Sequence, residues 1–342
     1  MERKKILIYL YAAIGDTITS LPVVRAILQK YRNDDIKIVV EYYNSNNFQL
    51  NILEELPEKA QVEFVRQYPL RSFRVLFERL KQCLRWRKEK FDIGYILILY
   101  GTPWRKRFVF RYIAGIKKLY CTDFFRKFDN ILHKSIIKQY ENFGFKFEES
   151  TKKLQYPFSK KHLQIADDFF NKLSLAQEKT PIAVGITAVT QNNFSWSQER
   201  YIELLKTIIS EYNLYPLFFC APHEREKIMP VLNAIGSGEI ISDFKAVDVM
   251  AIMSRCRFYL GNDTGTMHMA DCAGIPCVTI FCNRDYFMAW SPEGEHHINI
   301  IHHQPCGECH LKVCKFGFPA RCISEISVKE VKNAVAKLMQ KN

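Results

Sequence analysis

Short runs of apolar residues alternate along the chain with longer segments in which apolar residues recur at helical spacing. In the first half, residues 6–12, 36–42 and 93–100 have the pattern of buried strands, and residues 17–31 have the pattern of a helix. Continuous apolar runs are typical of parallel strands covered on both faces. The order of strands and helices therefore predicts an α/β fold with a parallel, doubly wound sheet.

The same pattern restarts after a polar stretch at residues 174–180. The predicted strands are residues 181–186, 214–220, 258–261 and 276–281, and the predicted helices are residues 197–211 and 327–339, the second capped by Ser327. We expect two Rossmann-like domains, residues 1–165 and 166–342, with a linker near residues 155–180. A ligand should bind in the cleft between them, at the carboxyl ends of the strands.

Residues 70–86 carry apolar side chains at helical spacing, with Arg and Lys filling or following the other face. We interpret this segment as a core helix with a solvated cationic face. The alternative is a basic amphipathic helix that lies on an anionic bilayer. The cationic run at residues 104–107, with Arg111, leaves the same two interpretations open.

Length and composition support two globular domains. The chain has 342 residues, of which 48% are hydrophobic and 25% charged. Its net charge of +13 is uneven: residues 1–180 hold 34 Lys and Arg against 20 Asp and Glu, whereas residues 181–342 hold 15 against 16. The basic first half indicates an anionic partner. The alternative is that its positive charge only forms a solvated surface. The absence of a recognition helix, RNA-binding motif or zinc-finger helix argues against nucleic acid.

No apolar stretch reaches the roughly 18–20 residues that a membrane-spanning helix needs. The first apolar run ends in Gly15-Asp16 and not in a signal-peptide cleavage site, so a buried first strand explains it better. We therefore expect a cytoplasmic protein whose eleven cysteines are mostly reduced.

Two strand-to-helix turns carry candidate chemistry. Residues 13–22 connect the first strand to the first helix and place Asp16 at or beside the helix N-terminus, as an N-cap or as a catalytic carboxylate. Residues 258–270 contain the sequence Gly-Asn-Asp-Thr-Gly-Thr-Met-His from Gly261 to His268. Backbone N–H groups at such a turn, with its Thr hydroxyls, form an anion site that suits a nucleotide diphosphate.

Together these two motifs closely resemble glycosyltransferase family 9, the family that contains the lipopolysaccharide heptosyltransferases. The resemblance rests on Gly15-Asp16 followed by Leu21-Pro22, and on Gly261–Gly265 followed by Met267-His268. Weaker matches follow in order at residues 91–93, 133–135, 142–144 and 289–292.

The resemblance implies a GT-B fold, in which two Rossmann-like domains face each other across a cleft. The N-terminal domain would bind the acceptor and the C-terminal domain the nucleotide-sugar donor. Asp16 would be the general base of an inverting transfer that needs no metal cofactor. The donor would be held by the following residues: Thr187, Thr190, Glu224, Asp263, Thr264, Gly265, Thr266 and His268.

Some of these residues have alternatives. Glu224 is preferred over Glu226 as the acid near the nucleoside, and either can be an ordinary helix-start acid. Many family members have a donor-contacting Lys before a Trp, where this chain has Phe194 ahead of Trp196. A different donor, a cation from elsewhere or weak activity would follow from this departure.

Cys306, Cys309, Cys314 and Cys322 form a C-x2-C-x4-C-x7-C array near the C-terminus. Four thiolates would suit a structural zinc ion, although the later spacings are irregular for a zinc ribbon. Free or buried thiols are the main alternative, and disulfides are a third.

The sequence thus predicts an inverting glycosyltransferase that moves a sugar, heptose from ADP-heptose, onto a lipopolysaccharide core or similar anionic glycolipid. It would act in the cytoplasm, peripherally attached to the anionic inner-membrane surface through its basic N-terminal half. The alternative is a degenerate family member that binds a nucleotide sugar without transferring it.

Overall fold

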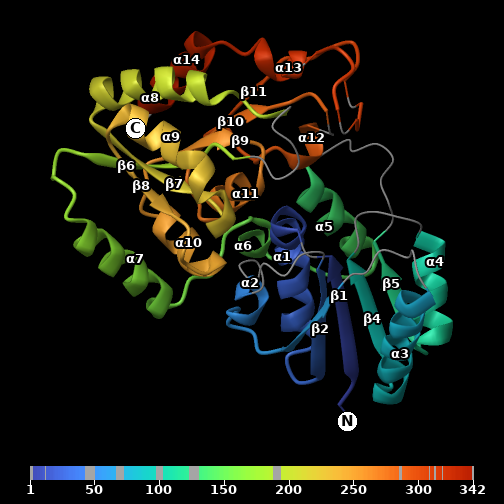
Figure 1. Cartoon of the computed structure of the whole chain (residues 1–342). Coiled ribbons are helices and arrows are strands. Elements are labelled where there is room, and N and C mark those ends of the chain that lie inside the picture. Colours follow the sequence, from blue (N-terminus) through green and yellow to red (C-terminus); the bar gives the residue numbers. More distant parts are fainter. Residues whose placement is uncertain are drawn as a thin grey trace. The chain divides into compact units, whose positions relative to one another are not determined.

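The structure is a computed structural model, and it forms two compact units. It describes residues 3–11, 13–42, 51–66, 73–97, 103–122, 131–187, 194–284, 287–307, 309–311, 313–317 and 319–340. The first unit comprises residues 1–128 and 132–154, and the second comprises residues 129–131 and 155–342 (Figure 1).

The first unit is a five-stranded parallel sheet with helices on both faces. Its elements are β1 (Lys5–Tyr11), α1 (Ile14–Lys30), β2 (Asp35–Tyr42), α2 (Asn51–Glu54), β3 (Gln61–Arg66), α3 (Phe73–Glu89), β4 (Ile93–Leu97), α4 (Pro103–Phe108), the π-helix η2 (Val109–Ile113), β5 (Lys118–Cys121), α5 (Leu132–Asn142) and α6 (Glu149–Lys152). The strand order is β3-β2-β1-β4-β5.

Each face of this sheet has its own core. On one face, Leu7 and Tyr9 of β1 pack with Trp86 of α3 and Phe110 of η2. On the other, Tyr95 of β4 makes ring contacts with Tyr31, Tyr120, Tyr140 and Phe145. Alternate residues of a strand point to opposite faces, so the continuous apolar runs supply both cores.

The second unit is a six-stranded parallel sheet, again between two helical layers (Figure 1). Its elements are α7 (Lys160–Leu173), β6 (Thr180–Gly185), α8 (Gln198–Tyr212), β7 (Leu214–Phe219), the 3₁₀ helix η4 (Pro222–Glu224), α9 (Arg225–Ile235), β8 (Glu239–Ile241), α10 (Ala246–Met253), β9 (Tyr259–Asn262), α11 (Gly265–Cys272), β10 (Cys277–Phe281), α12 (Phe287–Trp290), β11 (Ile298–Ile301), α13 (Arg321–Ser324) and α14 (Val328–Gln340). The strand order is β11-β10-β9-β6-β7-β8.

The predicted helix starts of this unit are confirmed. Ser197 caps α8 by accepting a hydrogen bond from the backbone N–H of Arg200 at 3.4 Å. Ser327 and Glu330 form a reciprocal capping box at α14, in which the Glu330 carboxylate accepts from the Ser327 backbone N–H at 2.7 Å.

Two sequence-based expectations differ from the structure. The linker expected near residues 155–180 is largely occupied by α7, which packs against α10 and belongs to the second unit. The contacts accordingly divide the chain between residues 154 and 155, ahead of the boundary expected after residue 165.

The second correction concerns α3, expected to bury its apolar stripe. The stripe residues described by the structure are exposed, and the helix is held to the sheet by Cys83 and Trp86 instead. Within the described residues, no helix is long and apolar enough to cross a membrane.

Candidate active site

Each sheet reverses its strand order once, and the predicted site residues follow the strands at these two points. In the first unit, β1 lies between β2 and β4, and Asp16 follows β1. In the second unit, β6 lies between β7 and β9, and the Asp263–Thr266 turn follows β9. Loops leave such a point in opposite directions and open a crevice at the carboxyl ends of the strands.

Asp16 is a buried carboxyl group in the first turn of α1, only 7% exposed. It is not the N-cap, since that position belongs to Ala13. Within the described residues, its Oδ1 atom is buried without a hydrogen-bond partner. Burial raises the pKa of Asp16 from its ordinary value to about 7, despite the helix N-terminus. A carboxyl group with this pKa accepts a proton readily near neutral pH.

The turn after β9 presents backbone N–H groups and two hydroxyls at the start of α11. Thr264 occupies the N-cap position and makes no capping bond with its side chain. Its Oγ1 instead contacts that of Thr266 at 2.8 Å. Asp263, Thr264, Gly265 and Thr266 are all half-buried. The first N–H groups of α11 and these hydroxyls therefore suit an anion such as a diphosphate.

Tyr259, the first residue of β9, holds this turn in place through its hydroxyl group. The Tyr259 hydroxyl donates to the Asn262 carbonyl at 3.1 Å and lies 3.0 Å from Thr266 Oγ1. Gly185 and Gly261 face each other in register on β6 and β9, and a Cβ atom on Gly261 would lie 2.4 Å from the Tyr259 hydroxyl. Both glycines are thus required for the phenol to reach the turn.

A buried amide connects the same edge to the segment before α8. Asn262 is 2% exposed, and its side chain donates to the Ile186 carbonyl at 3.0 Å. It also accepts from the backbone N–H of Trp196 at 3.2 Å. The chain after β6, the segment before α8 and the end of β9 are therefore held as one rigid edge.

The other predicted donor residues lie in the second unit at neighbouring strand ends. Thr187 is half-buried, two residues beyond β6, and Thr190 lies outside the described residues. His268 is buried on α11, its ring centroid 5.6 Å from that of Trp290. Because β9, β6 and β7 are adjacent, the sheet brings Thr187, the Asp263–Thr266 turn and Glu224 to one edge.

Glu224 ends the 3₁₀ helix η4 after β7 and is 7% exposed. Its Oε2 accepts from the backbone N–H of Ala221 at 3.1 Å, so it stabilises its own turn. Glu226 is exposed on α9. The role of Glu224 beside a nucleoside stays a prediction.

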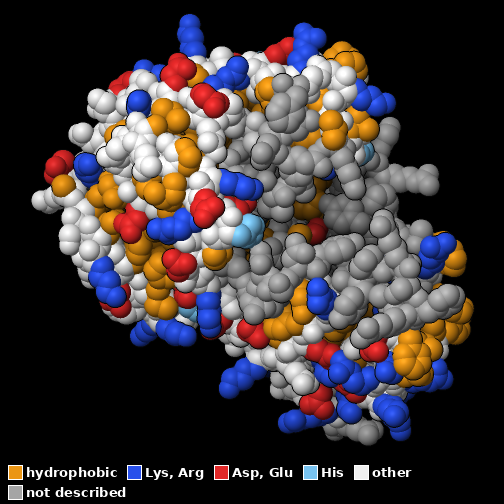
Figure 2. All heavy atoms as spheres, in the orientation of Figure 1, with side chains coloured by type: hydrophobic (Ala, Val, Ile, Leu, Met, Phe, Trp, Pro, Cys, Tyr) orange, Lys and Arg blue, Asp and Glu red, His pale blue; other side chains and the backbone are white. Residues whose placement is uncertain are grey.

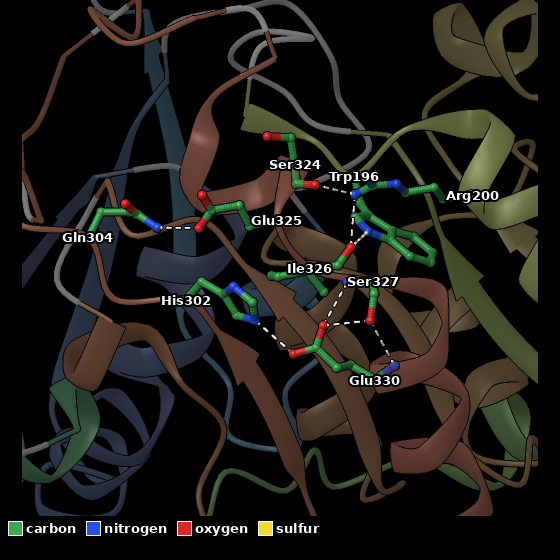
Figure 3. Close-up of polar contacts among 9 residues, drawn as sticks. All are labelled: Trp196, Arg200, His302, Gln304, Ser324, Glu325, Ile326, Ser327 and Glu330. Carbon is green, nitrogen blue, oxygen red and sulfur yellow. Dashed lines mark hydrogen bonds and ion pairs between the residues drawn. The ribbon is translucent and has the colours of Figure 1, made fainter.

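Sequence reasoning missed one cation at this edge. The guanidinium of Arg284, three residues beyond β10, lies 5.3 Å from the centre of the buried Phe194 ring. The nearest cation along the sequence, Arg200, donates to the backbone carbonyls of Ser324 and Ile326 (Figure 3). Arg284 is distant from Phe194 in sequence. Phe194 follows β6 and Arg284 follows β10, and only the pairing of both strands with β9 indicates that the two segments meet at one edge of the sheet.

The segment that carries Cys306, Cys309, Cys314 and Cys322 is held to the second unit by contacts at both of its ends. Gln304 donates to Glu325 at 2.7 Å, and His302 lies 2.7 Å from Glu330 (Figure 3). Trp196 and Arg200 bind the carbonyl of Ile326. These contacts connect the strand before the cysteines and the helices after them to α8.

The eleven cysteines all lie among the described residues, and none of them forms a disulfide. Burial raises the pKa of Cys322, a backbone N–H of Asn283 lowers it, and the nearby thiols of Cys314, Cys306 and Cys309 raise it further. The backbone N–H of Phe316 donates to Cys314 Sγ at 3.4 Å. Among the described residues, no three His, Cys, Asp or Glu side chains are grouped so that they could hold a metal ion. A metal at the four cysteines stays a prediction.

The sequence model of glycosyltransferase family 9 (heptosyltransferase) matches residues 127–318, more than half of the chain. The chain belongs to this family, and its two parallel-sheet domains have the GT-B fold. A search of curated proteins finds no match.

Solved structures give the same fold over nearly the whole chain. A family 9 glycosyltransferase from Veillonella parvula is 18% identical, with a TM-score of 0.75 over 99% of this chain and 98% of that one. The ADP-heptose lipopolysaccharide heptosyltransferase II of E. coli is 17% identical, with a TM-score of 0.71 over 98% and 99%. The E. coli heptosyltransferase WaaC with ADP-2-deoxy-2-fluoro heptose is 16% identical, with a TM-score of 0.65 over 97% and 99%.

Proposed function

We propose that this family 9 glycosyltransferase transfers heptose from ADP-heptose, with inversion, onto the core of a lipopolysaccharide or a similar anionic glycolipid. The observation that carries the proposal is Asp16, a buried carboxyl group whose pKa is raised to about 7 at the point where the first sheet reverses its order. A solvated carboxylate is a much weaker base near neutral pH.

The transfer step needs a base and an anion site, and no metal cofactor is required for it. An acceptor hydroxyl attacks the anomeric carbon of the sugar, while the bond from that carbon to the diphosphate oxygen breaks. The hydroxyl proton passes to the Asp16 carboxylate, and the bonding electrons leave with the nucleoside diphosphate. The N–H groups and hydroxyls at Thr264–Thr266 would stabilise the developing negative charge.

Arg284 supplies the cation that this chain lacks at Phe194. Its guanidinium lies over the ring of Phe194, and Phe194 is the residue that this chain has where many family members have a Lys. An arginine can pair with two phosphate oxygens at once. We propose that Arg284 binds the donor diphosphate, with Thr187, Thr190 and His268 as further donors and Glu224 near the nucleoside.

The choice of donor has support from two similar structures. One is named as an ADP-heptose heptosyltransferase, and the other was solved with an ADP-heptose analogue. The replacement of the Lys by Phe194 favours a second candidate, a family member that binds a nucleotide sugar without transferring it.

Calorimetric titration of the whole protein with ADP-heptose, ADP and a UDP-sugar tests the proposal. We expect micromolar binding of the adenine nucleotides. Arg284→Gln should weaken it about tenfold or more, or 1.4 kcal/mol. Arg255→Gln is the matched control, because Arg255 is an exposed arginine of the same unit paired with Asp167 at 2.8 Å.

The outcomes separate the two candidates. Binding by the wild type, followed by transfer to a glycolipid acceptor that Asp16→Asn abolishes, supports the enzyme. Binding with no transfer to any lipopolysaccharide core acceptor supports the binding protein. If no nucleotide binds, both are contradicted.

A structural zinc ion at Cys306, Cys309, Cys314 and Cys322 is a separate proposal. Two of these thiols, Cys314 and Cys322, accept backbone N–H groups, a contact that stabilises a thiolate. Elemental analysis of the purified protein tests it: about one zinc per chain, lost in Cys309→Ser and Cys314→Ser, is expected. Metal-free protein with unchanged thermal stability after chelation would contradict it.

The proposed location is the cytoplasmic face of the inner membrane, where a glycolipid acceptor would present its sugar. The basic first half favours attachment to the anionic membrane surface.

A further inference from the structure

Helix α3 exposes an apolar stripe that the structure leaves uncovered. Leu76, Phe77, Leu80 and Leu84 are 57%, 56%, 42% and 44% exposed. Their spacing places them on one face of the helix, since residues three and four apart are neighbours on its surface. The adjoining side of the helix packs Cys83 and Trp86 into the core of the first unit. The stripe is therefore not required for packing α3 onto its sheet.

A second exposed apolar group adjoins the first. Trp104 and Phe108 of α4 and Tyr112 of η2 are 66%, 54% and 65% exposed. The rings of Phe108 and Tyr112 are 5.2 Å apart. Arg87 of α3 joins the two groups by donating to the Tyr112 carbonyl at 2.8 Å. We call these seven side chains, with the cations among them, the α3–η2 surface.

Cations surround the apolar side chains. Helix α3 holds six Lys and Arg and two Glu, and α4 with η2 holds four Lys and Arg and no acid. Lys81 lies 4.5 Å from the centre of the Phe77 ring. An open depression of about 590 Å³ is lined by Lys81, Leu84, Arg85, Arg87 and Lys88. Figure 2 shows hydrophobic and cationic side chains mixed at the lower right, where Figure 1 places α3 and α4.

We propose that the α3–η2 surface docks the enzyme on an anionic lipid bilayer. The apolar and aromatic side chains would enter the boundary between headgroups and acyl chains, where such residues bind favourably. The cations would lie at the level of the anionic headgroups, and the depression beside Lys81 would accept a lipid phosphate. Exposed apolar patches of this kind mark interaction surfaces.

Charge selects the bilayer over a second copy of this chain. In a symmetric dimer, the surface would meet itself, and its exposed Lys and Arg side chains would face the same side chains of the second copy with few acids to balance them. Two acids near the surface are already paired, Glu78 with Lys81 at 3.4 Å and Glu63 with Arg85. An anionic bilayer is complementary both to the positive charge of the α3–η2 surface and to its apolar side chains.

This inference deepens the proposed function, since it rests on a lipid-bound acceptor, but it is tested without any transfer reaction. Flotation of the full chain with vesicles would compare phosphatidylcholine alone with a mixture in which about a third is phosphatidylglycerol. We expect the wild type to bind the anionic vesicles and to bind the neutral ones at least tenfold more weakly.

Two pairs of substitutions locate the surface. Phe77→Gln with Leu80→Gln removes apolar contacts while keeping good helix-forming residues, and Lys81→Gln with Lys88→Gln removes charge. Each pair should weaken vesicle binding about tenfold or more. Met229→Gln and Lys206→Gln are matched controls on exposed positions of α9 and α8, and they should bind like the wild type.

Three results would overturn the inference. The wild type fails to bind anionic vesicles, the α3 variants bind as tightly as their controls, or the wild type is a dimer that Phe77→Gln dissociates without affecting vesicle binding. Calorimetry of nucleotide binding on the same variants should be unchanged. If neither the wild type nor the variants bind nucleotide, that result would instead count against the proposed function.

Discussion

At the scale of single residues, the decisive feature is the environment of Asp16. A carboxyl group in the first turn of a helix is usually stabilised as an anion. Here removal from water outweighs that effect and raises the pKa to about 7. Near neutral pH, the group is therefore divided between its protonated and ionised states.

The pH dependence of transfer follows from this pKa. We expect kcat/KM to rise with pH through about 7 and to level off above it, because only the ionised carboxyl group can take the proton. Asp16→Asn should lose about 10²–10⁴-fold in rate together with this dependence. Asp271→Asn is the control, because Asp271 is a half-buried carboxyl group whose pKa is also raised to about 7. If the rise of kcat/KM with pH disappears in Asp271→Asn, the pH dependence arises from Asp271 and not from Asp16.

Stability should change in the opposite sense. The folded pKa of Asp16 lies above the unfolded value near 4, so the folded state loses stability from this group as the pH rises from about 4 to about 7. Asp16→Asn should therefore raise the free energy of unfolding at pH 8, by up to about 4 kcal/mol, and change it little at pH 4. Urea denaturation at the two pH values measures this, and equal effects at both would refute it.

At the scale of elements, the anion site depends on close contact between β6 and β9. A Cβ atom on Gly261 would lie 2.3 Å from the Gly185 carbonyl oxygen, which is backbone and has little room to move. The tight pairing lets the Tyr259 hydroxyl reach Thr266 and hold the start of α11.

Gly261→Ala should therefore displace the turn. We expect a loss of about 1–3 kcal/mol in the free energy of unfolding and a nucleotide affinity at least tenfold weaker. Gly236→Ala is the comparison, since Gly236 ends α9 with φ +66° and nothing within 4 Å of an added Cβ. It should cost about 1 kcal/mol and leave nucleotide affinity unchanged. Equal losses of affinity would show that the effect is not local.

Most elements could be predicted from the sequence, because buried parallel strands and their connecting helices have distinct periodicities. The α3 helix shows the limit of this reasoning. Periodicity identifies an apolar stripe but not the side that faces the sheet, and here Trp86 and Cys83 are packed while Leu76 and Leu80 are exposed. The two turns at the strand ends were predictable as motifs. Arg284 was not, because its proximity to Phe194 depends on strand pairing.

At the scale of the whole molecule, each unit has its own sheet, core and strand-order reversal. The acidic candidate base lies in the first unit, and the anion site lies in the second. The net positive charge is concentrated in the first half of the sequence. The division of labour expected from the family, with the acceptor bound by the first unit and the donor by the second, stays a prediction.

Hydrogen exchange with and without ADP tests this division. We expect the strongest added protection in the second unit, at the turn after β9 and the start of α11, because bound phosphate would hold those N–H groups. Peptides from α3 should exchange as before. Protection centred on the first unit would contradict the assignment of the donor site.

The contacts in Figure 3 have a consequence for how this fold can change. His302, Gln304, Ser324 and Ile326 fix both ends of the segment that carries the four cysteines. When the ends of a loop are held together, doubling its length adds only about 0.6 kcal/mol to the entropy of closing it. Insertions between residues 315 and 320, which leave the spacing of Cys306, Cys309 and Cys314 unchanged, should therefore be inexpensive, and the sheet need not adjust to them. This is where evolution, or a designer, can add a new module without rebuilding the enzyme.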